Sequence, residues 1–186
     1  MVACGPQQPK PTLSQRPEAA KTGQALPFTP IQQPLSLNGL TADPCRILNR
    51  EQVAATVADP PDDVKATPRS DELGIRCSWV QWGAPLISVV VPSRTLTNLD
   101  ELAKYHEKRA GNLEPWAETS MYGLPVVIYR EVPGPANCDV AVGITDTTMI
   151  HVGLVGNQTH SQYWENDPCG NALKTTEFVI NALRNH

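Results

Sequence analysis

The chain has 186 residues and a formal net charge of −4, with 40% hydrophobic, 18% charged and 5% aromatic side chains. This length suits one ordinary domain with a tail. No run of about 18 apolar residues is present, so no segment is expected to span a bilayer as a helix. The acidic balance argues against nucleic acid and anionic lipid headgroups as main partners. The 18 prolines and 12 glycines argue against a helical bundle and a collagen-like chain.

Cys4 stands apart from the other cysteines, directly after Met1, Val2 and Ala3. An apolar residue and two small ones before a Cys form the end of a bacterial lipobox. There, signal peptidase cleaves before the Cys and the thiol carries a diacylglyceryl group. The charged and apolar regions that precede a lipobox are missing, so we expect either a start codon further upstream or a chain trimmed near its mature end. We predict Cys4 as the lipidation site; the alternative is an unmodified Cys beside a start Met.

Residues 5–40 form a tail of Pro, Gln, Thr, Ser and Ala with scattered charges. Such a composition offers too little apolar surface to offset the entropy of ordering the chain. We therefore predict a disordered, partly extended segment, with one folded domain over residues 41–186. As a tether behind Cys4, the tail would reach about 35 Å when coiled and about 110 Å when extended. The alternative is a disordered terminus with no role.

The other four cysteines are Cys45, Cys77, Cys138 and Cys169. None forms a CxxC motif and no His lies at ligand spacing from any of them, which argues against zinc and thioredoxin chemistry. In an exported chain the even number indicates two disulfides, with three possible pairings. We favour Cys45–Cys169, because each follows Asp-Pro at a helix start, and Cys77–Cys138, because each begins a strand. Each bridge would contribute about 4 kcal/mol in the chain-entropy model.

The hydrophobic pattern predicts helices and strands in the order α-β-β-α-β-β-β-α. Asn49 and Gln52 form a capping box for an early helix, and Thr97 or Asn98 caps a second helix that ends at Gly111. Hairpin-length links predict an antiparallel sheet of about five strands with helices on one side, an α+β fold. The expected strands are 75–82, 86–91, 124–132, 137–144 and 147–155, and the expected helices are 44–48, 49–57, the one after Asn98 and one from Pro168 or Cys169.

Several short motifs recur in an order that points to one family. They are Asp43-Pro44-Cys45 with Ile47-Leu48, Glu51-Gln52-Val53-Ala54, Cys77-Ser78-Trp79, Gly123-Leu124-Pro125, Cys138-Asp139-Val140-Ala141-Val142-Gly143 and Asp167-Pro168-Cys169. From about Thr41 onward the chain resembles the DUF3558 family of actinobacterial lipoproteins, which includes several mycobacterial Lpr-type proteins. The resemblance implies export, a lipidated N-terminal Cys and paired disulfides. It brings no established activity, so it assigns no catalytic residue.

The sequence predicts no catalytic, metal or cofactor site. A serine hydrolase needs an exposed Ser on a sharp turn, usually Gly-x-Ser-x-Gly, and a His to activate it. That motif is absent, and His160 beside Ser161 is better explained as exposed loop polarity. The acids, Asp139 among them, are attributed to a solvated surface, because adjacent acids point apart and no calcium-loop spacing occurs.

Aromatic side chains are the best candidates for a binding surface. Trp79 and Trp82 lie on opposite faces of one expected strand, so at least one lies outside a helix-covered core. The other candidates fall in loops, where exposed aromatic residues commonly form binding sites; packing in the core is the alternative. The predicted binding residues are Trp82, Trp116, Tyr122, Tyr163 and Trp164.

These features predict a non-enzymatic, monomeric domain anchored by lipid to the extracytoplasmic face of an actinobacterial membrane. It would bind a protein or envelope component through one sheet face and its loops. The alternative is a carrier or sensor of an apolar small molecule or lipid in a cleft between sheet and helices. An envelope hydrolase is a third hypothesis.

Overall fold

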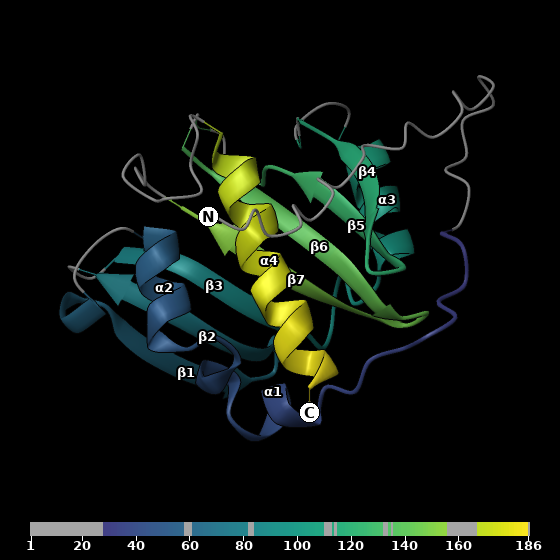
Figure 1. Ribbon diagram of the computed structural model, residues 1–186. Coiled ribbons are helices and arrows are strands. Elements are labelled where there is room, and N and C mark those ends of the chain that lie inside the picture. Colours follow the sequence, from purple (N-terminus) through teal and green to yellow (C-terminus); the bar gives the residue numbers. More distant parts are fainter. Residues whose placement is uncertain are drawn as a thin grey trace, which may run out of the picture.

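A computed structural model describes residues 28–57, 61–81, 84–109, 113, 115–131, 134, 136–155 and 167–185. A seven-stranded antiparallel sheet in the order β1-β2-β3-β7-β6-β5-β4 forms its centre (Figure 1). The α+β class is confirmed, but the expected number of about five strands is wrong. The strands are β1 (Lys65–Asp71), β2 (Gly74–Gln81), β3 (Ala84–Pro92), β4 (Ala117–Met121), β5 (Leu124–Tyr129), β6 (Cys138–Thr145) and β7 (Thr148–Leu154). The helices are α1 (Asn38–Ala42), η1 (Pro44–Ile47), α2 (Arg50–Val57), η2 (Pro61–Asp63), α3 (Leu99–Lys108) and α4 (Pro168–Arg184).

The two strands that the sequence did not predict are the edge strands β1 and β4. β1 is polar and almost fully exposed, so it lacks the alternating pattern of a half-buried strand. It pairs with β2 along its whole length, and Pro68 is tolerated because an edge strand has a free side. β4 pairs with β5 through a tight turn in which both Tyr122 and Gly123 have positive φ. Pairing with an apolar neighbour, not local pattern, makes both segments strands.

Helices cover both faces of the sheet, which corrects the prediction of helices on one side. Side chains alternate between faces, so Val126 and Ile128 of β5 face one layer while Val127 and Tyr129 face the other. The first set packs with α1, η1, α2 and α4 in the larger core. The second packs with α3, which lies behind the sheet in Figure 1. β5 and β6 are buried along nearly all their length, and strands buried on both faces need a cover on each.

Residues 28–40, which the sequence placed in the tail, pack against the domain. The Phe28 N–H donates to Asp100 Oδ1 at 3.0 Å, and the Ile31 N–H donates to Asp146 Oδ1 at 2.9 Å. Leu40 is 1% exposed in the larger core. The packed domain therefore includes 28–40, and the boundary predicted at residue 41 is corrected. A few apolar residues among prolines suffice here, because α3 and the turn between β6 and β7 supply the hydrogen-bond acceptors.

The disulfides are Cys45–Cys77 and Cys138–Cys169, so the predicted pairing is wrong although all four cysteines are bridged. β3 and β7 lie between β2 and β6, which places Cys77 and Cys138 three strand spacings apart. Three spacings span about 14 Å, whereas a disulfide joins Cα atoms about 4–7 Å apart. Each bridge instead joins an Asp-Pro-Cys helix start to the strand beneath it.

The two predicted helix N-caps are confirmed, whereas α3 ends at Lys108 with Arg109 as its C-cap, before the predicted end at Gly111, which lies outside the described residues. The Asn49 and Gln52 side chains and backbone N–H groups bond reciprocally at 2.9 Å, which is the capping box. Asn98 Oδ1 accepts from the Glu101 N–H at 3.0 Å and caps α3. Capping interactions of this kind join residues that are close together in the sequence, so they can be predicted without knowledge of the fold.

Candidate functional sites

Two of the five predicted aromatic binding residues, Trp116 and Tyr122, lie in the described part of the chain. The Trp116 indole stacks on the His106 ring, with centroids 4.1 Å apart and planes 9° apart, on the α3 side of the sheet. Tyr122 is 49% exposed, donates to Glu177 Oε1 at 2.9 Å and lies under the guanidinium of Arg184, so it belongs to the α4 side. Trp82, Tyr163 and Trp164 lie outside the described residues. The two described members therefore lie on different sides of the molecule and share no surface.

The structure also describes Trp79 and allows searches for metal sites and membrane-spanning helices among the described residues. Trp79 is 3% exposed and belongs to the larger core, so the expectation that Trp79 or Trp82 lies outside a helix-covered core now depends on Trp82, which is outside the described residues. His160 and Ser161, the pair weighed for a hydrolase, lie outside the described residues, as does Cys4. Among the described residues, no group of three or more His, Cys, Asp or Glu side chains could hold a metal ion. In the same part of the chain, no helix is both long and apolar enough to cross a membrane.

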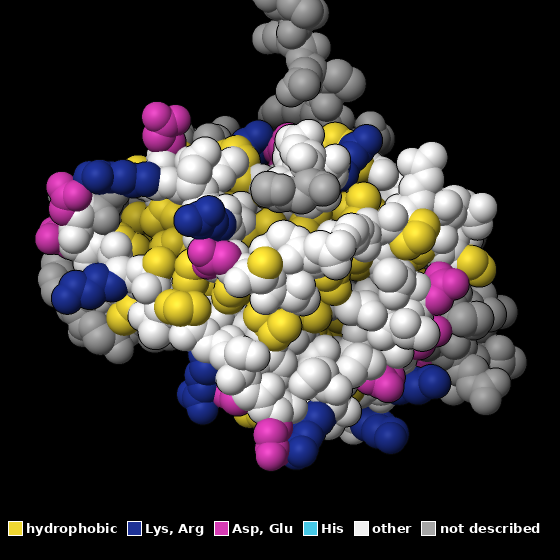
Figure 2. Space-filling view, turned by 90° about the horizontal axis from the view of Figure 1, so that it is seen from below, with side chains coloured by type: hydrophobic (Ala, Val, Ile, Leu, Met, Phe, Trp, Pro, Cys, Tyr) yellow, Lys and Arg dark blue, Asp and Glu magenta, His cyan; other side chains and the backbone are white. Residues whose placement is uncertain are grey.

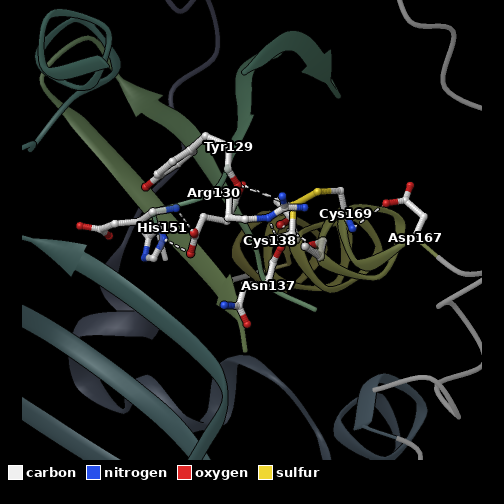
Figure 3. Close-up of a disulfide and its surroundings, with 11 residues drawn as sticks. Tyr129, Arg130, Asn137, Cys138, His151, Asp167 and Cys169 are labelled. Atoms are coloured by element: carbon white, nitrogen blue, oxygen red, sulfur yellow. Dashed lines mark hydrogen bonds and ion pairs between the residues drawn. A yellow bond between two sulfur atoms is a disulfide. The ribbon is translucent and has the colours of Figure 1, made fainter. Parts of the chain in front are cut away.

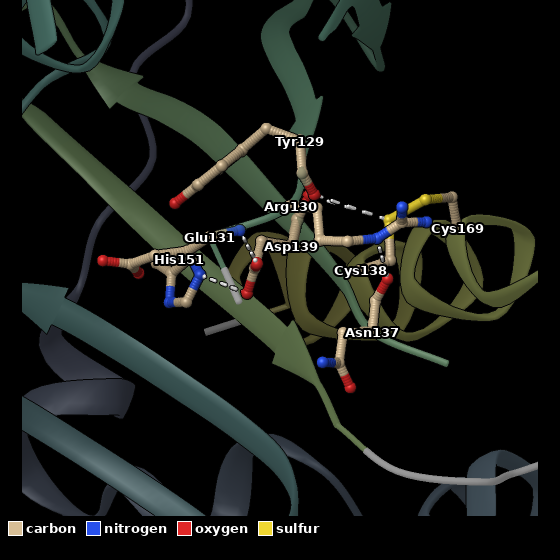
Figure 4. Close-up of polar contacts among 8 residues, drawn as sticks. All are labelled: Tyr129, Arg130, Glu131, Asn137, Cys138, Asp139, His151 and Cys169. Carbon is tan, nitrogen blue, oxygen red and sulfur yellow. Dashed lines mark hydrogen bonds and ion pairs between the residues drawn. A yellow bond between two sulfur atoms is a disulfide. The ribbon is translucent and has the colours of Figure 1, made fainter. Parts of the chain in front are cut away.

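A buried polar pair lies on the α3 side of β6 and β7, at a position that the sequence did not single out. His151 Nε2 and Asp139 Oδ1 are 3.0 Å apart, with side chains 18% and 10% exposed (Figure 4). Asp139 Oδ2 accepts from the Glu131 N–H at 2.7 Å, which fixes the carboxylate. Asp139 is therefore not the solvated surface acid that was expected. Its neighbour in the chain, Cys138, faces the opposite layer and bonds to Cys169 of α4 (Figure 3).

Tyr129 adjoins this pair and extends it into an aromatic row. Its ring centroid lies 5.9 Å from that of His151 and 6.2 Å from that of Trp116. The side chain is 3% exposed. Burial, together with the negative charge of Asp139, raises the pKa of the Tyr129 phenol well above its usual value. The row thus lies between α3 and the sheet, with the buried Tyr129 at its centre and partly buried rings on either side.

The His151–Asp139 pair resembles the acid–base half of a hydrolytic triad, and Ser88 lies nearby on β3. Ser88, Gly153 and Asp139 are aligned across three strands. A Cβ on Gly153 would lie 2.9 Å from Ser88 Oγ and 3.1 Å from Asp139 Oδ1. However, Ser88 lies in mid-strand, where the ladder occupies the backbone N–H groups that an oxyanion hole would need. No hydrogen bond joins Ser88 to His151 in the described part of the chain, so the arrangement orients a histidine without activating a nucleophile.

A groove of about 380 Å³ lies between the helical segment η1–α2 and the strands β1 and β2. Trp79 and the apolar side chains of Leu48 and Val53 form its inner wall, and an ion pair between Arg50 and Asp62 stands at its rim. Figure 2 shows hydrophobic side chains gathered in a hollow on this side of the molecule, with charged side chains around it. The sequence analysis did not predict the groove, because β1, which forms one of its walls, was not among the expected strands. The complete lining is Cys45, Leu48, Arg50, Val53, Asp62, Val64, Ala66 and Trp79.

A second, smaller cavity of about 200 Å³ lies under residues 28–31, beside the start of α3. The Ile31 side chain reaches Gly143, where an added Cβ would lie 3.1 Å from Ile31 Cδ1 and 3.2 Å from Leu99 Cδ1. Residues 28–31 therefore form the outer wall of this cavity.

The architecture defines a class: a disulfide-linked α+β domain whose helices flank one antiparallel sheet. Within that class, the chain belongs to the DUF3558 family, described as a protein of unknown function, whose model matches residues 1–182. This match confirms the family that the motifs indicated. No curated protein and no solved structure matches the chain.

Proposed function

We propose that the protein is a non-enzymatic binding domain, attached by a lipid on Cys4 to the extracytoplasmic face of an actinobacterial cell membrane. The observation that carries the proposal is the pair of disulfides, Cys45–Cys77 and Cys138–Cys169. Disulfides persist in oxidising compartments outside the cytoplasm and are rare within it. The lipobox-like sequence before Cys4 supplies the anchor, and residues 5–27 supply a spacer between membrane and domain.

The character of the polar cluster supports a binding role over a catalytic one. The His151–Asp139 pair is mostly buried, and among the described residues no serine is hydrogen-bonded to His151, which fits a role in orienting strands β6 and β7. The partner would be an envelope protein or another envelope component. On the α3 side of the sheet, α3 does not cover β1, β2 and β3. We place the partner's binding surface on this uncovered part of the sheet.

The anchor and the compartment are tested together by the intact mass of protein extracted from its native host. We expect a chain that begins at Cys4 with a diacylglyceryl-sized addition and gains four protons on reduction. A Cys4→Ala variant should leave the membrane fraction with both disulfides intact, which separates the anchor from the fold. An unmodified chain with free thiols would contradict the proposal.

Binding to a partner is tested by crosslinking in native membranes. A partner recovered with the anchored protein should be lost when a partly exposed side chain of the open sheet face is changed, for example Arg76→Glu. Thr41→Glu, an exposed position away from that face, is the matched control. Failure of any crosslink to respond to the sheet face would contradict this part of the proposal.

A second candidate function is favoured by the groove between η1–α2 and β1–β2. Its volume of about 380 Å³ falls within the range of small-molecule sites, about 300–1,000 Å³. It lies between sheet and helices, where the sequence analysis placed the cleft of a carrier or sensor of an apolar molecule. Co-purification of an apolar molecule from native membranes, detected by mass spectrometry after solvent extraction, would support this function.

A further inference from the structure

One half of the sheet carries no helix on the side where α3 lies, among the described residues. The core under α3 takes its sheet residues from β5, β6 and β7, and α1, η1, α2 and α4 pack on the opposite side (Figure 1). Cys77 and Trp79 of β2 point into the larger core, so Arg76 and Ser78 between and beside them point toward the α3 side. We call this surface of β1, β2 and β3 the open sheet face. The residues of it used below are Lys65, Arg69, Asp71 and Arg76.

The charge of the open sheet face is opposite in sign to that of the whole chain. The face carries three cationic side chains, Lys65, Arg69 and Arg76, and one carboxylate, Asp71, whereas the chain has a net charge of −4. Lys65 and Arg69 are four residues apart on β1, so both side chains point to the same side of the sheet. A cationic face on an acidic protein attracts an anionic partner to that face in preference to the rest of the surface.

Two arginines lie directly opposite each other across the β1–β2 ladder. Arg69 and Arg76 are register partners, an arrangement in which like charges destabilise a sheet. Asp71 Oδ2 lies 2.5 Å from Arg69 Nε and 3.9 Å from Arg76 Nη2, so Arg69 holds most of the single carboxylate. The Arg76 side chain is 33% exposed, and its guanidinium keeps N–H donors for a second carboxylate.

We propose that the open sheet face binds a short acidic segment of a partner protein, whose carboxylates pair with Arg76 and Lys65. This inference rests on the proposed binding domain and names the chemistry of its partner. Asp71 already shows that a carboxylate fits beside the two guanidinium groups. Three strands of about seven residues offer an area of about 300 Å², whereas a standard interface buries about 800 Å² on each partner. The face therefore suits a segment and not a large folded surface.

The charges of the chain itself argue that the acidic segment comes from another protein. Residues 5–27 carry three Lys or Arg side chains and one Glu, so the tail has the same sign of charge as the face. In a symmetric dimer formed through this face, the same cationic side chains of two copies would meet. Both arrangements place like charges together, which costs free energy instead of supplying it.

A rhodamine-labelled peptide of eight residues, with Glu and Ala in alternation, tests the inference by fluorescence anisotropy with the full, disulfide-bonded chain. In an extended peptide its Glu side chains share one face, as the cationic side chains of β1 do. We expect saturable binding at about 20 mM salt and weaker binding at about 200 mM, because exposed charges are screened. The same peptide with Gln in place of Glu should not bind. Equal binding of the two peptides, or no binding of the Glu peptide, would overturn the inference.

Two double variants locate the binding on the sheet. Arg69→Gln with Arg76→Gln should weaken binding of the Glu peptide by about tenfold. Arg46→Gln with Arg50→Gln removes the same two charges from exposed positions on the helices of the opposite side and should change the affinity by less than about twofold. Equal losses of affinity in the two double variants would overturn the inference.

Asp71→Asn provides a gain of affinity, which a loss of folding cannot produce. The substitution removes the carboxylate that competes for Arg69 and Arg76, and the Asn side chain keeps an Oδ1 acceptor for the Leu73 N–H. The Glu peptide should therefore bind about threefold more tightly. Unchanged or weaker binding in Asp71→Asn would overturn the inference.

Further outcomes separate this inference from other partners and from the proposed binding domain. Binding to phosphatidylglycerol vesicles that requires Arg69 and Arg76, without binding of the Glu peptide, would overturn the acidic segment in favour of a lipid surface. A crosslinked partner in native membranes that depends on Arg76, again without peptide binding, would overturn the acidic segment and leave the proposed domain intact. Peptide binding without any crosslinked partner in native membranes would support the inference and contradict the proposed function.

Discussion

The disulfide pairing gives the sharpest test of the fold. The two bridges close loops with sequence separations of 32 and 31 residues. In the chain-entropy model each contributes about 3.7 kcal/mol to the free energy of unfolding. Cys45→Ala with Cys77→Ala removes one bridge, whereas Cys45→Ala with Cys169→Ala removes one partner from each and leaves Cys77 and Cys138 unpaired. The first variant should therefore lose about 3.7 kcal/mol and the second about 7.4 kcal/mol.

Thermal unfolding followed by circular dichroism measures these losses. For a chain of this size, about 1 kcal/mol shifts the unfolding temperature by about 2–4 °C, so the first variant should unfold about 7–15 °C lower. The second should be largely unfolded at room temperature, because its loss is comparable to the whole stability of many domains. Apart from Cys4, alkylation under denaturing conditions should find two free thiols in the second variant and none in the first. A second variant with no free thiol other than Cys4 and with the stability of the first variant would refute the pairing.

Three further predictions concern the strands and the segment at 28–31. Gly74→Ala should lower the free energy of unfolding, measured in urea, by about 3 kcal/mol, because the φ of Gly74 is +139° and an added Cβ would lie 2.1 Å from the Val91 carbonyl oxygen. Gly123→Ala, with open space around its Cβ, should lower it by only about 1 kcal/mol. Equal losses in the two variants would contradict this prediction. The raised pKa of Tyr129 favours the neutral phenol in the folded state, so the free energy of unfolding should fall as pH rises above the usual tyrosine pKa of 10.0. The fall should be smaller in Tyr129→Phe. If the free energy of unfolding depended on alkaline pH in the same way in both proteins, Tyr129 would not be its cause. Asp146→Ala removes the acceptor of the Ile31 N–H, so hydrogen exchange at Ile31 should become faster and the free energy of unfolding should fall by about 1 kcal/mol. Exchange at Leu154 in β7, which is the control, should stay unchanged. Unchanged exchange at Ile31 would contradict the contact.

The unpredicted His151–Asp139 pair shows why a register cannot be taken from a turn alone. The hairpin at Asp146 places Thr145 opposite Thr148, and continuing that register would set Asp139 opposite Leu154. An irregularity between Gly143 and Thr145 shifts the pairing by one residue, so Asp139 instead lies opposite Gly153 and diagonal to His151. One extra residue reverses which side chains share a face, and nothing in the local sequence requires that bulge.

Local patterns in the sequence determined the elements that depend on near neighbours: the capping box at Asn49, the cap at Asn98, the five inner strands and the α+β class. The count of cysteines determined that four would be bridged, and the ordered motifs determined the family. The tertiary structure alone decided which cysteines meet, because β3 and β7 separate two pairs that looked alike in the chain. It also decided that polar β1 is a strand and that α3 covers the second face of the sheet. These outcomes depend on contacts between segments far apart in sequence, whose energies no local pattern contains.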